Sequence, residues 1–106
     1  MRVRWSSAAR LDLLELVEFI RRDRPNAARR LAARIRAVAL STARHPRMGR
    51  MVPETGDPEI RERIVAPYRV LYHLGEDILI LAIIHGRRGL KRALGLPSDP
   101  ESEGDQ

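Results

Sequence analysis

The chain has 106 residues, a hydrophobic content of 43% and no cysteine. This composition fits one domain with one core, and it excludes a disulfide framework and cysteine-based metal or redox sites. The longest apolar run, residues 78–84, is far shorter than the roughly 20 residues of a membrane span, and no signal peptide precedes it. We therefore expect a cytoplasmic protein without a membrane partner.

The charge is strongly positive and unevenly distributed. Removing the four acidic charges of residues 97–106 raises the net charge from +6 to +10 for residues 1–96, and Lys91 is the one lysine among the 20 basic residues. Such a field favours an anionic partner, either nucleic acid or an acidic protein segment. Base composition of the genome and solubility are an alternative explanation of the arginine excess.

The first half of the chain predicts a short strand and two helices. Residues 1–5 alternate between apolar and charged side chains, as in a strand, and Ser6 or Ser7 can cap the helix that follows. Its apolar stripe consists of Ala9, Leu13, Leu16, Val17 and Ile20. A second helix is expected from about Pro25 to Ala43, with a stripe of Ala28, Leu31, Ala32, Ile35 and Val38 or Ala39. These helices should form an antiparallel hairpin.

The second half predicts three consecutive strands. A loop rich in proline and glycine covers residues 45–58, with a brief extended piece at Arg50–Glu54. The strands follow at Glu59–Val65, Tyr68–Leu74 and Asp77–His85, and turns at Ala66-Pro67 and Gly75-Glu76 connect them. The last strand is almost entirely apolar, which is typical of a central strand. One or two helical turns at Gly89–Leu94 come next.

The predicted fold is a single α+β domain over residues 1–96, in the order β-α-α-β-β-β. A small, curved antiparallel sheet would pack one face against the N-terminal helical hairpin, with the first strand at the sheet edge. Residues 97–106 form an acidic tail without a core-forming residue, and we expect it to be disordered.

A cluster of arginines is the main candidate site. The two-residue period of a strand places Arg61 and Arg63 on one face, with Ile60 and Ile64 turned toward the helices. If the three strands pair in order, an exposed side of the sheet would collect Arg61, Arg63, Arg69, Arg87 and Arg88. Guanidinium groups bind phosphate through planar, bidentate hydrogen bonds. The alternative is a solvated strand face of ordinary charge.

Other candidate groups are sparse. His85 could act as a general acid or base, or close its strand through a hydrogen bond. Tyr68 and Tyr72 share a strand face, where they either pack at the edge of the core or stack on bases, and Trp5 should anchor the first strand to the helices. We find no metal-ligand spacing, phosphate-binding loop or Ser/His/Asp order, so no metal or cofactor is expected.

Five segments follow one another along about residues 3–88: WSSAARLDLLELVEFI, RPNAARRLAARI, Gly49-Arg50, RERIVAPYRVLYHL and ILILAIIHGRR. In this order they resemble the RelE/ParE superfamily of toxins from type II toxin–antitoxin systems, and the ParE branch in particular. The resemblance implies a small sheet with an N-terminal helical hairpin.

The RelE branch implies cleavage of messenger RNA on the ribosome by basic residues of the sheet and a C-terminal tyrosine. By motif, Arg69 of YRVLY matches the phosphate-contacting arginine of that branch, and Arg88 of HGRR matches the later arginine. Arg61 and Arg63 lie near the positions of its paired strand lysines. No tyrosine follows Tyr72, and arginine is a poor general base, so the nuclease set is incomplete.

The ParE branch implies inhibition of DNA gyrase and neutralisation by an antitoxin, whose N-terminal domain binds operator DNA. We therefore expect a gyrase-inhibiting toxin, with a ribosome-dependent mRNA endoribonuclease as the alternative and a non-toxic regulatory partner as a third possibility. The target-binding candidates are Arg61, Arg63, Arg69, His85, Arg87 and Arg88. The candidates for binding the cognate antitoxin are Arg29, Arg30, Arg34 and Arg36, on the outer face of the second helix. Operator DNA would be contacted only through the antitoxin.

Overall fold

The computed structural model describes residues 1–86, 89–93 and 95. Its elements are β1 (Val3–Trp5), α1 (Ser7–Arg21), α2 (Pro25–Ser41), β2 (Arg50–Met51), β3 (Ile60–Val65), β4 (Tyr68–Leu74), β5 (Ile78–His85) and α3 (Leu90–Ala93). This order confirms the predicted α+β class, including the extended piece at Arg50 and the helical turn after Gly89. The acidic tail, together with Arg87 and Arg88, lies outside the described residues.

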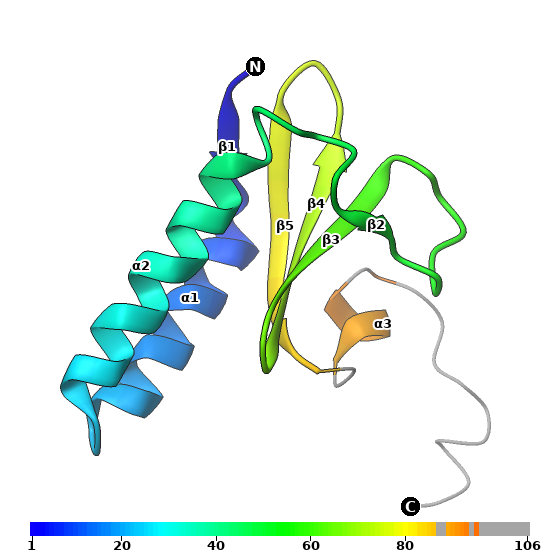
Figure 1. Cartoon of the computed structure of the whole chain (residues 1–106). Coiled ribbons are helices and arrows are strands. Elements are labelled where there is room, and N and C mark those ends of the chain that lie inside the picture. Colours follow the sequence, from blue (N-terminus) through cyan, green and yellow to red (C-terminus); the bar gives the residue numbers. More distant parts are fainter. Residues whose placement is uncertain (87–88, 94, 96–106) are drawn as a thin grey trace, which may run out of the picture.

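The strands form one sheet in the order β1-β5-β4-β3-β2 (Figure 1). Strands β2 to β5 pair antiparallel with their neighbours, whereas β1 pairs parallel with the start of β5. The sheet is therefore mixed. The prediction of an antiparallel sheet was wrong for β1. Because the whole helical hairpin and three strands separate β1 from β5 in the chain, no tight turn imposes an antiparallel direction on this pair.

The helical hairpin covers one face of the sheet, as expected. Ser6 caps α1 by accepting a hydrogen bond from the Ala9 backbone N–H at 3.0 Å, and Pro25 lies in the first turn of α2. The predicted stripe of α2 is confirmed, since its buried residues are Ala28, Ala32, Ile35 and Ala39. The main core lies between the hairpin and residues of β3, β4 and β5, with Trp5 packed against it as predicted.

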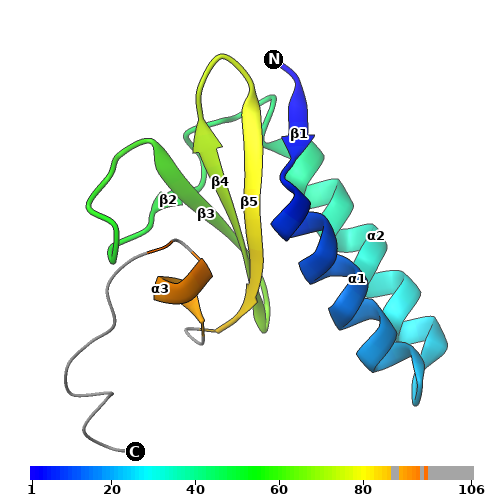
Figure 2. The same ribbon diagram turned by 180° about the vertical axis from the view of Figure 1, so that it is seen from behind.

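The opposite face of the sheet has a second, smaller core. Helix α3 lies on this face, away from the hairpin (Figure 2). Its Leu90 is 2% exposed and packs with Val52, Leu71, Ala82 and Ile84. None of the helices among the described residues is both long and apolar enough to span a bilayer. The sheet is thus covered on both sides, but by elements of very different size.

Side chains protect the β1 edge of the sheet. Strand β1 pairs only with the first three residues of β5, Ile78 to Ile80. Further along β5, the Ser6 hydroxyl donates to the Leu81 carbonyl at 3.1 Å, and the Ile83 backbone N–H donates to the Asp12 carboxylate at 2.9 Å. Helix α1 thereby satisfies backbone groups that would otherwise offer an open edge for strand addition.

Candidate functional site

The two faces of β3 are the reverse of the predicted arrangement. Val65 belongs to the main core under the helices, so the alternating Arg61 and Arg63 are also turned toward the helix side. Ile60 packs against the second core, and Ile64 is 55% exposed. The prediction that Ile60 and Ile64 face the helices is therefore wrong, because the apolar contact of β3 with the main core is made by Val65 near the strand's end.

Arg61 and Arg63 have specific partners at the end of the sheet. The Arg61 guanidinium donates to the carbonyls of Pro58 at 2.9 Å and Gly49 at 3.1 Å, which ties together the two ends of a long loop. Arg63 donates to the Ser41 hydroxyl at 3.3 Å, at the C-terminal end of α2. Both residues are only partly buried, so they stabilise the fold through these hydrogen bonds and are still accessible to solvent.

Tyr72 supports the same loop from the core. Its side chain is fully buried, and its hydroxyl donates to the Pro46 carbonyl at 2.7 Å and accepts from the Gly49 N–H at 3.1 Å. Burial raises the pKa of the Tyr72 hydroxyl above its usual value. A side chain at Gly49 would overlap the Tyr72 hydroxyl and the Glu62 carbonyl, so this close approach requires glycine. Tyr72 is therefore a core residue rather than a stacking surface.

Arg69 lies on the opposite face of the sheet from Arg61 and Arg63, and it is only 5% exposed. Its Nε donates to Glu62 at 2.7 Å, and a second nitrogen donates to the other Glu62 oxygen. Further contacts at 3.4 Å reach Glu54 and the Gly86 carbonyl. Hydrogen bonding to Glu62 is the main cause of the raised pKa of Arg69.

The predicted convergence of the arginines on one exposed side of the sheet is therefore wrong. Glu62 and Arg69 are diagonal neighbours on adjacent strands, so the arginine meets a carboxylate instead of solvent. Glu62 is fully buried and also lies 3.5 Å from the exposed Arg50. The sequence analysis missed this ion cluster, which consists of Glu54, Glu62, Arg69 and Arg50. A signal was present, because the alternation along β3 places Glu62 between Ile60 and Ile64 on one face, where a lone carboxylate needs a basic partner.

His85 ends β5 on the helix side and is exposed. Its ring packs edge-on against Tyr68, with 5.4 Å between the ring centroids. The two rings border a hollow of about 280 Å³, whose other lining residues include Asp12, Glu15 and Phe19 of α1. The structure thus places His85 apart from the Arg69 cluster, and its role in target binding stays a prediction. Arg87 and Arg88 follow it outside the described residues.

All the charged side chains on the outer face of α2 are basic. Its four arginines are all exposed, as predicted: Arg29, Arg30, Arg34 and Arg36. The helix contains no acidic residue, and in the part of the chain that the structure describes none of the four pairs with a carboxylate. These arginines are free to meet an acidic partner, and their role in antitoxin binding stays a prediction.

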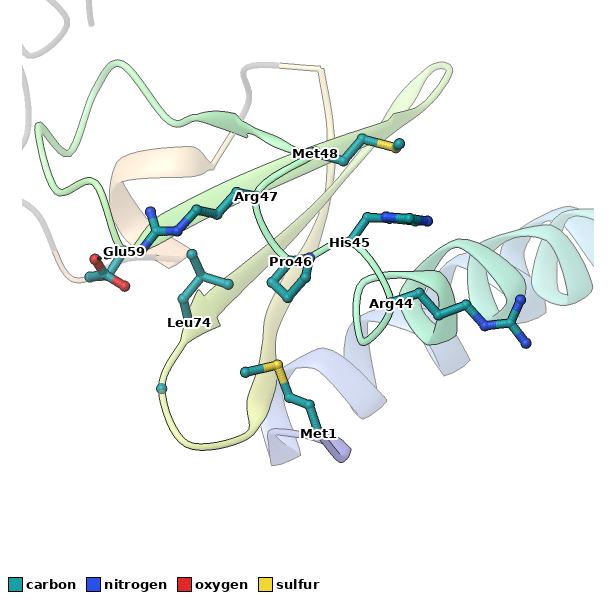
Figure 3. Close-up of a pocket in the computed structure, with 9 residues that line it drawn as sticks. Met1, Arg44, His45, Pro46, Arg47, Met48, Glu59 and Leu74 are labelled. Carbon is teal, nitrogen blue, oxygen red and sulfur yellow. Dashed lines mark ion pairs between the residues drawn. The ribbon is translucent and has the colours of Figure 1, made fainter.

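One hollow beside the loop after α2 was not foreseen from the sequence. Four apolar side chains, Met1, Pro46, Met48 and Leu74, line what we call the methionine pocket, which has a volume of about 670 Å³ (Figure 3). Arg44 and His45 lie on one side of it, and on the other Arg47 approaches Glu59 at 3.5 Å. Only the fold brings residue 1 beside the loop after α2. Across the described residues, no group of acidic and histidine side chains could hold a metal ion.

Comparison with known proteins places this geometry in a family. The family described as the ParE toxin of the type II toxin–antitoxin system, parDE, matches residues 3–90. The chain belongs to the ParE toxin family. It is a type II toxin of the RelE/ParE superfamily, and such a toxin implies a cognate antitoxin protein as partner.

Individual relatives agree with this assignment. Y4kP of Sinorhizobium fredii, described as a candidate toxin, is 33% identical over 82% of this chain and 90% of its own length. The toxin RelE2 of Caulobacter vibrioides is 33% identical over 79% of this chain and 93% of its own length. A structure of a chromosomal ParDE toxin–antitoxin system from P. aeruginosa has the same fold, with a TM-score of 0.69 and 20% identity over 82% of this chain and 97% of that one.

Proposed function

We propose that this ParE-family toxin acts in the cytoplasm by binding and inhibiting DNA gyrase, rather than by cutting RNA, until its cognate antitoxin neutralises it. The observation that carries the choice is the burial of Arg69 against Glu62 and Glu54. The resemblance to the ParE branch suggests gyrase as the target, and the state of Arg69 supports this choice over the nuclease alternative.

A phosphate-binding arginine needs free donors on an accessible guanidinium. In Arg69 these donors are directed to Glu62 and Glu54, and the side chain is 6% exposed. A phosphate that approached this position would also meet the repulsion of two carboxylates. Together with the absence of a tyrosine after Tyr72, this leaves the nuclease chemistry without its phosphate anchor and without the C-terminal tyrosine that the resemblance to the RelE branch implies.

Arg69 then supports the toxin through its neighbours instead of touching the target. Its guanidinium donates to Glu62 of β3 and to the carbonyl of Gly86, which directly follows β5. Arg69 therefore connects β3 with the end of β5. We place the gyrase contact on the remaining candidates, namely Arg61, Arg63, His85, Arg87 and Arg88. The outer face of α2 is left for the antitoxin, because its unpaired arginines attract an acidic segment.

The second candidate function is a ribosome-dependent mRNA endoribonuclease. One observation favours it: a relative 33% identical over 79% of this chain carries the name RelE2. On this alternative, Arg69 would have to leave Glu62 when RNA binds, and a group other than tyrosine would have to transfer the proton.

The test is to titrate the purified protein into a gyrase supercoiling assay and, separately, into a translation reaction whose messages are sequenced at their ends. We expect loss of supercoiling or trapped DNA cleavage, with intact messages, and restoration of gyrase activity by the antitoxin. Full gyrase activity at a large excess of toxin, with messages cut within codons, would replace the proposal by the nuclease alternative. Expression without antitoxin gives the same contrast in cells as DNA damage against transcript cleavage.

A further inference from the structure

The outward face of α2 carries an apolar stripe between its arginines. Ala33, Ala37 and Leu40 recur at helical spacing and are exposed, and Leu40 is 68% exposed. By the same spacing, Arg29 and Arg36 border the stripe on one side, and Arg30 and Arg34 border it on the other. Leu40 and the two alanines therefore form a continuous apolar stripe with arginines on both sides.

This stripe continues into the methionine pocket. A small hollow of about 260 Å³ at the end of α2 is lined by Ala37, Leu40, Ser41 and Arg44. Arg44 also lines the methionine pocket, so one side chain borders both hollows. The pocket offers strongly exposed sulfur-containing side chains, because Met1 and Met48 are 60% and 63% exposed, above a floor formed by Leu74 at 8%.

The charges along the α2 stripe and the methionine pocket, which we together call the track, are mainly positive. Arg44 and His45 extend the basic border of α2 to the pocket, and Figure 3 shows both directed away from Arg47 and Glu59. Among the described residues, Glu59 is the one carboxylate that lines the pocket, and it already pairs with Arg47. The track therefore matches a segment that is acidic along its length and apolar at its end.

We propose that the antitoxin's acidic segment lies along α2 as a helix and inserts an apolar side chain into the methionine pocket. The inference rests on the proposed neutralisation by an antitoxin and adds where its anchor lies. Small residues at positions 33 and 37 let a partner helix approach closely, and α2 runs for roughly 12 Å from Ala33 to its end at Ser41. Flexible methionines adapt to the inserted group, and the charged rim shields it from water.

A second copy of this chain is the less suitable occupant. In a two-fold dimer the same surface meets itself, so the arginines of one track would face those of the other. Charge complementarity thus favours a different, acidic chain.

The test measures binding of the antitoxin encoded in the same operon to the full toxin chain by titration calorimetry. Met48→Glu removes the apolar lining and adds a repelling charge to the pocket. Leu14→Glu is the matched control, since Leu14 of α1 is 64% exposed against 63% for Met48 but lies outside the track. We expect Met48→Glu to weaken binding at least about tenfold and Leu14→Glu to change it by less than about twofold. Thermal unfolding of both variants checks that each is folded.

A second pair separates charge from apolar contact. Arg44→Glu should weaken binding at least about fivefold, more strongly at low than at high salt, whereas Arg22→Glu, just after the end of α1, should have a much smaller effect. If Met48→Glu leaves tight binding unchanged, or if Leu14→Glu weakens binding equally, the antitoxin does not insert into the pocket. The role of the antitoxin as partner would then remain. No binding by the wild-type chain would overturn that role and the inference with it. A free dimer that Met48→Glu converts to monomer would assign the pocket to a second copy instead.

Discussion

The two faces of this sheet are built in different ways. The face under the helical hairpin is an ordinary apolar core, with Ile35, Ile78 and Ile80 fully buried. The other face has a small apolar cluster beside a buried ion pair, Glu62 with Arg69. Charge in a strand therefore does not by itself identify a binding surface. On the second face, Arg69, which matches the phosphate-contacting arginine of the RelE branch by motif, is paired with a carboxylate inside the fold.

The largest effect is expected from breaking the ion pair. Glu62→Ala should lower the free energy of unfolding by about 3 kcal/mol, because Arg69 stays buried with only the more distant Glu54 as a carboxylate partner. Urea denaturation measures this loss. Glu59→Ala is the control, since Glu59 pairs with the exposed Arg47, and it should cost less than about 1 kcal/mol. Equal losses would show that the second face does not depend on its buried charges.

The next effect tests the polar contact within the hairpin face. Tyr72→Phe should lower the free energy of unfolding by about 1–2 kcal/mol, because the buried Gly49 N–H and the Pro46 carbonyl lose their partner.

Tyr72 should also make the stability of the wild-type chain depend on pH. Burial raises the pKa of Tyr72 in the folded chain, so the unfolded chain releases this proton first, and the wild-type contribution is complete below about pH 10 and falls as the pH rises above it.

Urea denaturation between pH 8 and 11 at about one-unit steps would reveal this slope. The part of the slope that comes from Tyr72 should disappear in Tyr72→Phe, while the half-buried Tyr68 serves as control through Tyr68→Phe. An identical alkaline loss of stability in Tyr72→Phe and the wild type would contradict the assignment of this titration to Tyr72.

A smaller effect is expected at the edge of β5 where Asp12 of α1 accepts a hydrogen bond from the backbone. Asp12→Ala should cost about 1 kcal/mol and speed hydrogen exchange at the Ile83 amide, because that N–H loses its acceptor. Asp12→Asn keeps an acceptor oxygen and should retain most of the protection. Exchange of Ile83 that is unchanged in Asp12→Ala would mean that the carboxylate does not close this edge. Asp23→Ala, an exposed position between the helices, controls for the loss of one negative charge.

The smallest effect on stability belongs to the outer surface of the hairpin. Arg30→Glu combined with Arg34→Glu should change the free energy of unfolding by less than about 0.5 kcal/mol, since both side chains are exposed and neither pairs with a described carboxylate. Antitoxin binding should nevertheless weaken. A large loss of stability would show that these arginines support the fold, and the contrast between a structural second face and a recognition surface on α2 would then fail.

Much of the architecture could be predicted because it depends on local periodicity. The α2 stripe of Ala28, Ala32, Ile35 and Ala39 and the boundaries of β4 were correct, since each follows from spacing along one element. The site could not be predicted in the same way. Arg61 and Arg63 were assigned to the wrong side of β3, because an amphipathic strand with both isoleucines and charges does not itself indicate which face the helices will cover.

The family, the order of elements, the two-helix hairpin and the arginine-rich outer face of α2 could be predicted from the residues alone, because spacing, capping and turn chemistry act over a few residues. The packed fold was needed to show that β1 lies parallel to β5, that Glu62 pairs with Arg69 and that Met1, Met48 and Leu74 line one pocket. Each of these depends on which strands become neighbours, and strand order is set by packing of the whole chain rather than by the residues of any one element.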